Sequence, residues 1–466
     1  MSLSWMDPFI FADYISPQGA IGIKQYKYAS TNGSLYYKYV SGPLAAWLVD
    51  LCPRWVAPNV LTLWGFFNVL LAYALVWYYC PTFSEQAPSW VWICVSLLLF
   101  GYQTLDNMDG KQARKIGCGT PLGLSLDHGC DAVTSALIPA IGCAFFQTGQ
   151  SFWTILFIVS APICAFVLTW EEFYTGTFNL GKINGVDEGG LFTDCMFMCG
   201  GLAGKDRLTS FMNMRVSLFG SSTLLMKHVW VLALLGLVVL TVLPAIVNVV
   251  KIEKWKKAMY TEFEENIDSV KTNAALAAVS DESSHSPVRT SNGGPWTARH
   301  YRGKRPRVRD AFSAVLPVIF GSALWITAVY FPFKQSGILL EHTRTVIWLA
   351  VMLYSKLITH LHVAHVCGDP YYQWRKTYLI PVSLITTNAL YCDLFNTQEP
   401  FVNEITLLSV CCVFASVSWL HMCYSVVTGM CKALDIPFLT VPERCLVDTP
   451  TIAKKKARPA RRRKID

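Results

Sequence analysis

Four aspartates lie close together in the sequence, with a spacing that suits a single metal site. They are Asp106, Asp109, Asp127 and Asp131. The first two are three positions apart and the last two are four apart, so each pair shares one face of a helix. Crowded carboxylates in a partly dehydrated setting take up protons or bind cations. Because all the ligands are oxygens, the segment predicts two Mg²⁺ or Mn²⁺ ions that clamp a diphosphate.

Small and basic residues among these aspartates fit a nucleotide. Gly110, Ala113 and Gly123 would let a flat nucleotide approach the helix backbone closely. Arg114 can pair with phosphate oxygens. We therefore predict that these residues bind the nucleotide diphosphate beside the metals.

A Gly- and Pro-rich stretch separates the two aspartate pairs. Gly117, Gly119 and Pro121 indicate a turn that returns the second helix antiparallel to the first. The turn would bring all four carboxylates to one place.

The composition predicts the surroundings of this site. Hydrophobic residues make up 53% of the 466 positions and charged residues 15%, with a mean hydropathy of +0.36. This excludes an average soluble chain and predicts an all-α, polytopic membrane protein with about ten transmembrane helices. We expect the spans to begin near Asn59, Trp90, Cys130, Phe152, Gly190, Lys227, Phe312, Leu339, Tyr378 and Glu404.

Basic residues flank the apolar segments and indicate their sidedness. They gather before the first predicted span, between the second and third, and in the tail, so by the positive-inside rule both termini are cytosolic. Lys205, Arg207 and Arg215 lie on the predicted luminal side, where the positive-inside rule does not expect basic residues. The polar start of the chain, Met1 to Tyr39, does not resemble a cleavable signal peptide.

These features divide the chain into five regions. We predict a cytosolic region with an interfacial segment (1–57), catalytic helices (58–250), a partly disordered cytosolic linker (251–311), C-terminal transmembrane helices (312–430) and a basic cytosolic tail (431–466).

The net charge and the cysteines point to no further ligand. The charge of +8 arises beside apolar segments, which favours an anionic membrane surface and predicts no nucleic-acid partner. The sixteen cysteines are scattered without zinc-ligand spacing, so we interpret them as small buried apolar residues. His360, His362 and His365 fit ordinary interfacial or hydrogen-bonded histidines better than a metal site.

The aspartate segment resembles the signature of the CDP-alcohol phosphotransferase family. It reads Asp-x2-Asp-Gly-x2-Ala-Arg-x8-Gly-x3-Asp-x3-Asp, with every position filled. The resemblance implies that a hydroxyl acceptor displaces CMP from a CDP-linked group, with the carboxylates holding two metals at the cytosolic membrane face.

Residues 20 to 200 resemble the choline and ethanolamine phosphotransferase branch of that family. The motifs are Tyr26-Lys27-Tyr28, Ala57-Pro58-Asn59, Leu61-Thr62-Leu63, Asp127-His128-Gly129 and Trp170-Glu171-Glu172. The branch implies CDP-choline or CDP-ethanolamine and diacylglycerol as substrates, membrane lipids as surroundings, and residence in the endoplasmic reticulum or Golgi. The second half could support lipid access or a homodimer, and the sequence does not decide between them.

The resemblance gives roles to three polar residues. Asn59 would hydrogen-bond the nucleotide or phosphate, and a plain helix cap is nearly as good an interpretation. Glu171 and Glu172 would position the headgroup or mark the end of the fourth span.

The general base has two candidates. The resemblance assigns the role to Asp131, whereas a neutral His128 has a better matched unperturbed pKa. Leu124 stands where the branch usually has Glu, one turn before His128, which removes an expected orienting group.

Two rival functions remain at this point. One keeps the CDP chemistry but uses CDP-diacylglycerol and a soluble alcohol such as inositol. The other is a transporter or receptor with the same fold and no turnover.

Overall fold

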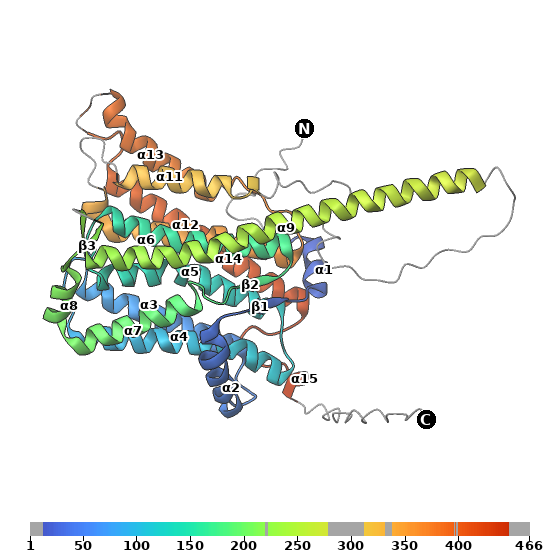
Figure 1. Ribbon diagram of the computed structural model, residues 1–466, viewed down its shortest axis with the longest axis horizontal. Coiled ribbons are helices and arrows are strands. Elements are labelled where there is room, and N and C mark those ends of the chain that lie inside the picture. The colour runs from blue at the N-terminus through green and yellow to red at the C-terminus, as the bar shows by residue number, and fades with distance from the viewer. Residues whose placement is uncertain are drawn as a thin grey trace.

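The protein is an all-α membrane protein whose long helices run side by side (Figure 1). The computed structural model describes residues 13–219, 222–277, 312–330, 338–395, 397 and 399–446. The long helices are α3 (Pro58–Tyr79), α4 (Ser89–Ile116), α5 (Pro121–Phe145), α6 (Phe152–Thr175), α7 (Asp187–Ala203), α9 (Met226–Ala277), α11 (Leu316–Tyr330), α12 (Ile338–Cys367), α13 (Lys376–Phe395) and α14 (Glu404–Leu434).

Each predicted span corresponds to one of these helices, but not all of them have the composition of a membrane span. Within the described residues, five stretches are long and apolar enough to cross a bilayer. They are Pro58–Tyr79, Phe152–Thr175, Met226–Lys251, His342–Cys367 and Glu404–Leu434. Helix α4 carries Asp106, Asp109, Lys111, Arg114 and Lys115 in its second half, which makes it more polar. A count of ten crossings therefore stays a prediction.

The N-terminal region contains two short helices and half of a small strand pair. Helix α1 (Pro17–Gln25) packs against α12 and α14. Helix α2 (Gly42–Leu51) buries Ala45 and Val49 but exposes Trp47 and Leu51, as a segment at a membrane interface would. A π-helical turn (Tyr37–Ser41) precedes it.

Strands are few and short. Strand β1 (Ser30–Asn32) pairs in parallel with β2 (Phe178–Leu180), and so ties the N-terminal region to the chain after α6. Helix α8 (Lys205–Met212) is followed by an antiparallel pair, β3 (Arg215–Phe219) and β4 (Ser222–Leu225). The last described helix is the single turn α15 (Glu443–Leu446).

The predicted turn between the two aspartate pairs is confirmed. Gly117 ends α4 in the left-handed region with φ of 71°, a conformation in which glycine carries no Cβ penalty. Thr120 then caps α5 by accepting a hydrogen bond from the Gly123 backbone N–H, and Pro121 occupies the first helical position.

Helix α5 lies at the centre of the fold. It packs against α3, α6, α12 and α14. Its second half, from Ala132 onward, is almost entirely buried in the main apolar core. Because α12 and α14 contact α5, the C-terminal helices support the helix that carries Asp127 and Asp131.

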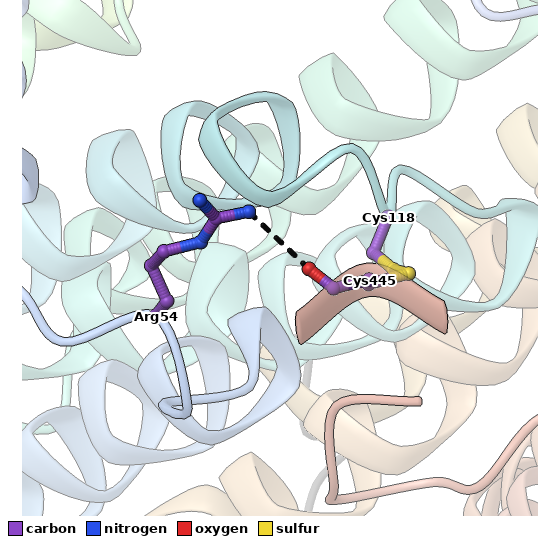
Figure 2. The surroundings of a disulfide bond; sticks show 3 residues. All are labelled: Arg54, Cys118 and Cys445. Atoms are coloured by element: carbon purple, nitrogen blue, oxygen red, sulfur yellow. Dashed lines mark hydrogen bonds between the residues drawn. A yellow bond between two sulfur atoms is a disulfide. The ribbon is translucent and has the colours of Figure 1, made fainter. Parts of the chain in front are cut away.

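The expectation that all the cysteines are buried apolar residues was wrong: Cys195 and Cys199 are exposed, and two others form a disulfide. Cys118, in the turn before α5, forms a disulfide with Cys445 in α15, with their Cα atoms 6.3 Å apart (Figure 2). The partners are 327 residues apart, so no local spacing could indicate the pair. Arg54 reinforces the junction by donating from Nη2 to the Cys445 carbonyl at 3.4 Å.

Helix α9 crosses the predicted start of the linker without a break. It continues to Ala277 and extends beyond the other helices (Figure 1). The remaining predicted linker, residues 278–311, lies outside the described residues.

Candidate active site

Three of the predicted metal ligands meet where α4 ends and α5 begins. Ligand oxygens of Asp106, Asp109 and Asp127 all lie within 4.8 Å of one another. This grouping follows from the helix faces and the Gly117 turn, because each aspartate points toward the partner helix. The three carboxylates form the carboxylate cluster.

Polar contacts leave part of this cluster open for a cation. The Thr62 hydroxyl, on α3, donates to Oδ2 of buried Asp109 at 2.5 Å. Oδ1 of Asp127 is buried and has no hydrogen bond within the described residues. A buried carboxylate oxygen without a donor is costly unless a cation occupies the position. The oxygen-only donor set fits Mg²⁺ or Mn²⁺.

Asp131 lies one helical turn beyond Asp127 and is not part of the carboxylate cluster. Its Oδ1 accepts a hydrogen bond from the Tyr102 hydroxyl at 2.6 Å. Tyr102 also contacts the Thr134 hydroxyl at 3.0 Å. These contacts fix one oxygen of Asp131 and leave the other for a ligand or a proton.

The predicted nucleotide-binding residues surround the same end of the helices. Asn59 faces Gly123, where an added Cβ would lie 3.2 Å from Asn59 Oδ1. A Cβ on Gly110 would lie 3.5 Å from Nη1 of Arg114, so the guanidinium extends over that glycine. Ala113 is half-buried between them. The close approach of a nucleotide to these small residues stays a prediction.

Asn59 also makes a contact that the sequence did not predict. Its Nδ2 donates to the backbone carbonyl of Phe438 at 2.7 Å. The segment between α14 and α15 therefore lies beside the predicted nucleotide site. The Cys118–Cys445 disulfide ties the α15 end of this segment to the turn before α5.

Two tyrosines from the N-terminal region approach the carboxylates. Burial raises the pKa of Tyr28 above its usual range, and the charges of Glu172, Asp127 and Asp106 add to the rise. Burial also raises the pKa of Tyr26, and the Glu172 charge adds to it. Both phenols therefore remain protonated at neutral pH.

The adjacent glutamates of α6 have different surroundings. Oε1 of Glu171 accepts hydrogen bonds from Asn179 at 2.9 Å and from Asn248 at 2.8 Å. Glu172 instead faces histidines: its Oε2 lies 3.9 Å from His128 Nδ1 and 3.8 Å from His362 Nδ1. Glu171, the predicted substrate contact, thus has Oε1 held by two amides, and its role in substrate binding stays a prediction.

His128 turns away from the carboxylate cluster toward α12. Its ring lies 4.1 Å from that of His362, centroid to centroid. Leu124, one turn earlier, packs against an apolar cluster formed with Ile23, Met422 and Val426. The position therefore serves packing rather than orientation of His128.

The comparison with protein families agrees with this geometry. Residues 55–184 match the family model described as CDP-alcohol phosphatidyltransferase. These residues form a CDP-alcohol phosphatidyltransferase domain. The domain contains α3 to α6, and with them the carboxylate cluster, Asn59, Arg114 and both glutamates.

Three relatives resemble part of the chain. An uncharacterized CDP-alcohol phosphatidyltransferase class-I family protein 2 of Dictyostelium discoideum is 32% identical over 240 residues, covering 52% of this chain and 56% of the relative. Choline/ethanolaminephosphotransferase 2 of Arabidopsis thaliana is 39% identical over 177 residues, covering 38% and 45%. Ethanolaminephosphotransferase 1 of Homo sapiens is 34% identical over 174 residues, covering 35% and 44%. The chain thus spans about half the length of these relatives.

Sequence reasoning gave no role to two residues that support the domain's carboxylates. Thr62 lies one turn after Asn59 on α3, and Tyr102 lies one turn before Asp106 on α4. Polar residues one turn from a predicted ligand, inside otherwise apolar helices, were the available signal.

Proposed function

We propose that this chain transfers phosphocholine or phosphoethanolamine from CDP-choline or CDP-ethanolamine to diacylglycerol, giving phosphatidylcholine or phosphatidylethanolamine and CMP. The observation that supports it most is the carboxylate cluster in a CDP-alcohol phosphatidyltransferase domain. The named relatives act on choline or ethanolamine derivatives by their printed names.

The metal ligands in this proposal are Asp106, Asp109, Asp127 and Asp131. Two Mg²⁺ or Mn²⁺ ions would neutralise the diphosphate charge and stabilise the departing phosphate of CMP. Thr62 and Tyr102 hold Asp109 and Asp131 in place through hydrogen bonds.

The other residues of the domain bind and orient the donor. Arg114 pairs with diphosphate oxygens from its exposed position at the end of α4. Asn59 and Gly123 form one wall of the nucleotide site, and Gly110 and Ala113 leave space for the phosphates. Binding places the headgroup phosphorus within reach of the acceptor hydroxyl.

The transfer requires one proton to leave the acceptor. Asp131 or His128 takes the proton from the diacylglycerol hydroxyl as its oxygen bonds to the headgroup phosphorus. The bond from that phosphorus to the CMP oxygen breaks, and CMP leaves with the negative charge. Diacylglycerol reaches the site from the membrane, between the apolar helices that surround it. We place the chain in the endoplasmic reticulum or Golgi membrane, with both termini in the cytosol.

A donor assay tests the proposal. Purified protein in lipid nanodiscs receives diacylglycerol, Mn²⁺ and either labelled CDP-choline or labelled CDP-ethanolamine. We expect equal amounts of CMP and labelled phospholipid from at least one donor. Product only from CDP-diacylglycerol with a soluble alcohol would replace the proposal, and no product from any donor would reject it.

A further inference from the structure

A second group of possible metal ligands lies beside the carboxylate cluster and has different chemistry. It consists of His128 on α5, Glu172 on α6 and His362 on α12, which we name the His–Glu–His cluster. One ligand atom from each lies within 4.8 Å of the others. Glu172 and His362 are 1% and 0% exposed, and the His128 side chain is 11% exposed.

The polar atoms of this cluster lack the partners that buried groups normally have. By hydrogen-bond geometry, neither oxygen of Glu172 and neither ring nitrogen of His362 has a partner within the described residues. Glu172 also has two further polar neighbours, the Tyr26 phenol and His365, whose Nε2 lies 3.8 Å from Glu172 Oε1. The contacts to Glu172 Oε2, at 3.8 and 3.9 Å, are too long to be hydrogen bonds. An ordinary buried histidine donates or accepts at least once, as His360 does at 2.6 Å from Arg375.

The open atoms converge on one point. Ligand atoms about 2.0 to 2.2 Å from a tetrahedral zinc ion lie roughly 3.4 Å from one another. The two separations from Glu172 Oε2, 3.8 and 3.9 Å, require a contraction of about half an ångström to close around such an ion. The ligand nitrogens of His128 and His362 lie within 4.8 Å of each other. A divalent cation would also neutralise the buried Glu172 carboxylate.

We propose that His128, Glu172 and His362 bind a zinc-class divalent cation through two imidazole nitrogens and one carboxylate oxygen. The mixed nitrogen and oxygen donors favour zinc over magnesium, whereas the carboxylate cluster offers oxygens alone. The two sites are adjacent in sequence, through Asp127 and His128, and differ in the metal they select.

This site would give the C-terminal helices a definite role. His362 lies outside the CDP-alcohol phosphatidyltransferase domain, so the cation joins α12 to α5 and α6 of that domain. Coordination also occupies the Nδ1 lone pair of His128. His128 is then not available as the base of the proposed reaction.

Metal analysis of the purified full chain tests the inference without using activity. The protein is loaded with zinc, washed with a weak chelator, desalted and analysed by mass spectrometry of its metals. We expect about one zinc per chain in the wild type, lost in His362→Ala and in Glu172→Gln. His360→Ala is the matched control on the same helix and should retain the zinc, as should Asp109→Asn in the carboxylate cluster.

A spectroscopic measurement on the wild type covers the case in which a variant does not fold. Cobalt in place of zinc should give the visible absorption bands of a four-coordinate nitrogen and oxygen site, and added zinc should remove them. Absence of retained zinc and of cobalt bands in the wild type would overturn the inference. Equal zinc retention in His362→Ala and His360→Ala would overturn it too.

Discussion

Thr62 donates a hydrogen bond to the carboxylate of Asp109 across the contact between α3 and α4, with Oγ1 2.5 Å from Oδ2. The bond fixes one oxygen of a buried carboxylate that lies within the carboxylate cluster with Asp106 and Asp127. Partners of this kind orient ligands and raise metal affinity.

Removing this hydroxyl should weaken metal binding without removing a ligand. In Thr62→Val we expect the Mn²⁺ concentration for half-maximal activity to rise by about 10-fold to 100-fold. A Mn²⁺ titration of CMP release measures it. Thr104→Val is the control, because the Thr104 hydroxyl bonds to the Phe100 carbonyl of its own helix; coinciding curves for the two variants would refute the role of Thr62.

The contact between Gly123 and Asn59 predicts a steric effect on nucleotide binding. A Cβ at Gly123 would press on Asn59 Oδ1 at 3.2 Å, so we expect Gly123→Ala to raise the KM for the CDP-alcohol about tenfold, or about 1.4 kcal/mol. Gly236→Ala in α9 is the matched control, since nothing lies within 4 Å of its added Cβ. An unchanged KM in Gly123→Ala would show that this wall does not contact the donor.

Leu124 occupies the position at which the choline and ethanolamine phosphotransferase branch usually has a glutamate. Substituting it tests whether this chain can accommodate a glutamate there. The side chain packs in an apolar cluster with Ile23 and Met422, so a carboxylate there loses water without gaining a partner. We expect Leu124→Glu to lower stability by about 1 to 3 kcal/mol, visible as a lower Tm, while Leu124→Met changes it little. A faster reaction at unchanged Tm would contradict this.

The disulfide predicts that the segment after α14 is held against the nucleotide site. With both proteins purified in the absence of reductant, we expect Cys445→Ser to show faster proteolysis between α14 and α15 and a free energy of unfolding lower by about 2 to 4 kcal/mol. Limited proteolysis followed by mass analysis measures the first effect. Cys195→Ser, at an exposed free thiol, is the control; matching digestion of both variants would argue against the tether.

Local features of the site could be predicted from the sequence because they depend on neighbours along the chain. The spacing of Asp106 and Asp109 sets their helix face, and Gly117 with Pro121 sets the turn. The sequence could not predict which of Glu171 and Glu172 faces the histidines. Adjacent helical residues point about 100° apart, and the packing of α12 decides which one faces His128.

Contacts between distant segments could not be predicted, because they depend on how the helices pack and not on neighbours along the chain. Asn59 meets Phe438, and Cys118 meets Cys445, only because α14 returns to the end of the fold where α3 begins. His362 was one of several similar histidines in the sequence. Its burial beside Glu172 distinguishes it from His360.

The metal dependence of CMP release tests the central claim most directly. Wild-type protein and Asp127→Asn are stripped with chelator and assayed with diacylglycerol and the preferred CDP-alcohol over a range of Mn²⁺. We predict no release by the stripped wild type, full recovery with Mn²⁺ or Mg²⁺, and a loss of at least about 100-fold to 1,000-fold in Asp127→Asn at any metal concentration. Release that persists without metal, or wild-type rates in Asp127→Asn, would contradict the assignment of the carboxylate cluster as a metal-dependent transfer site.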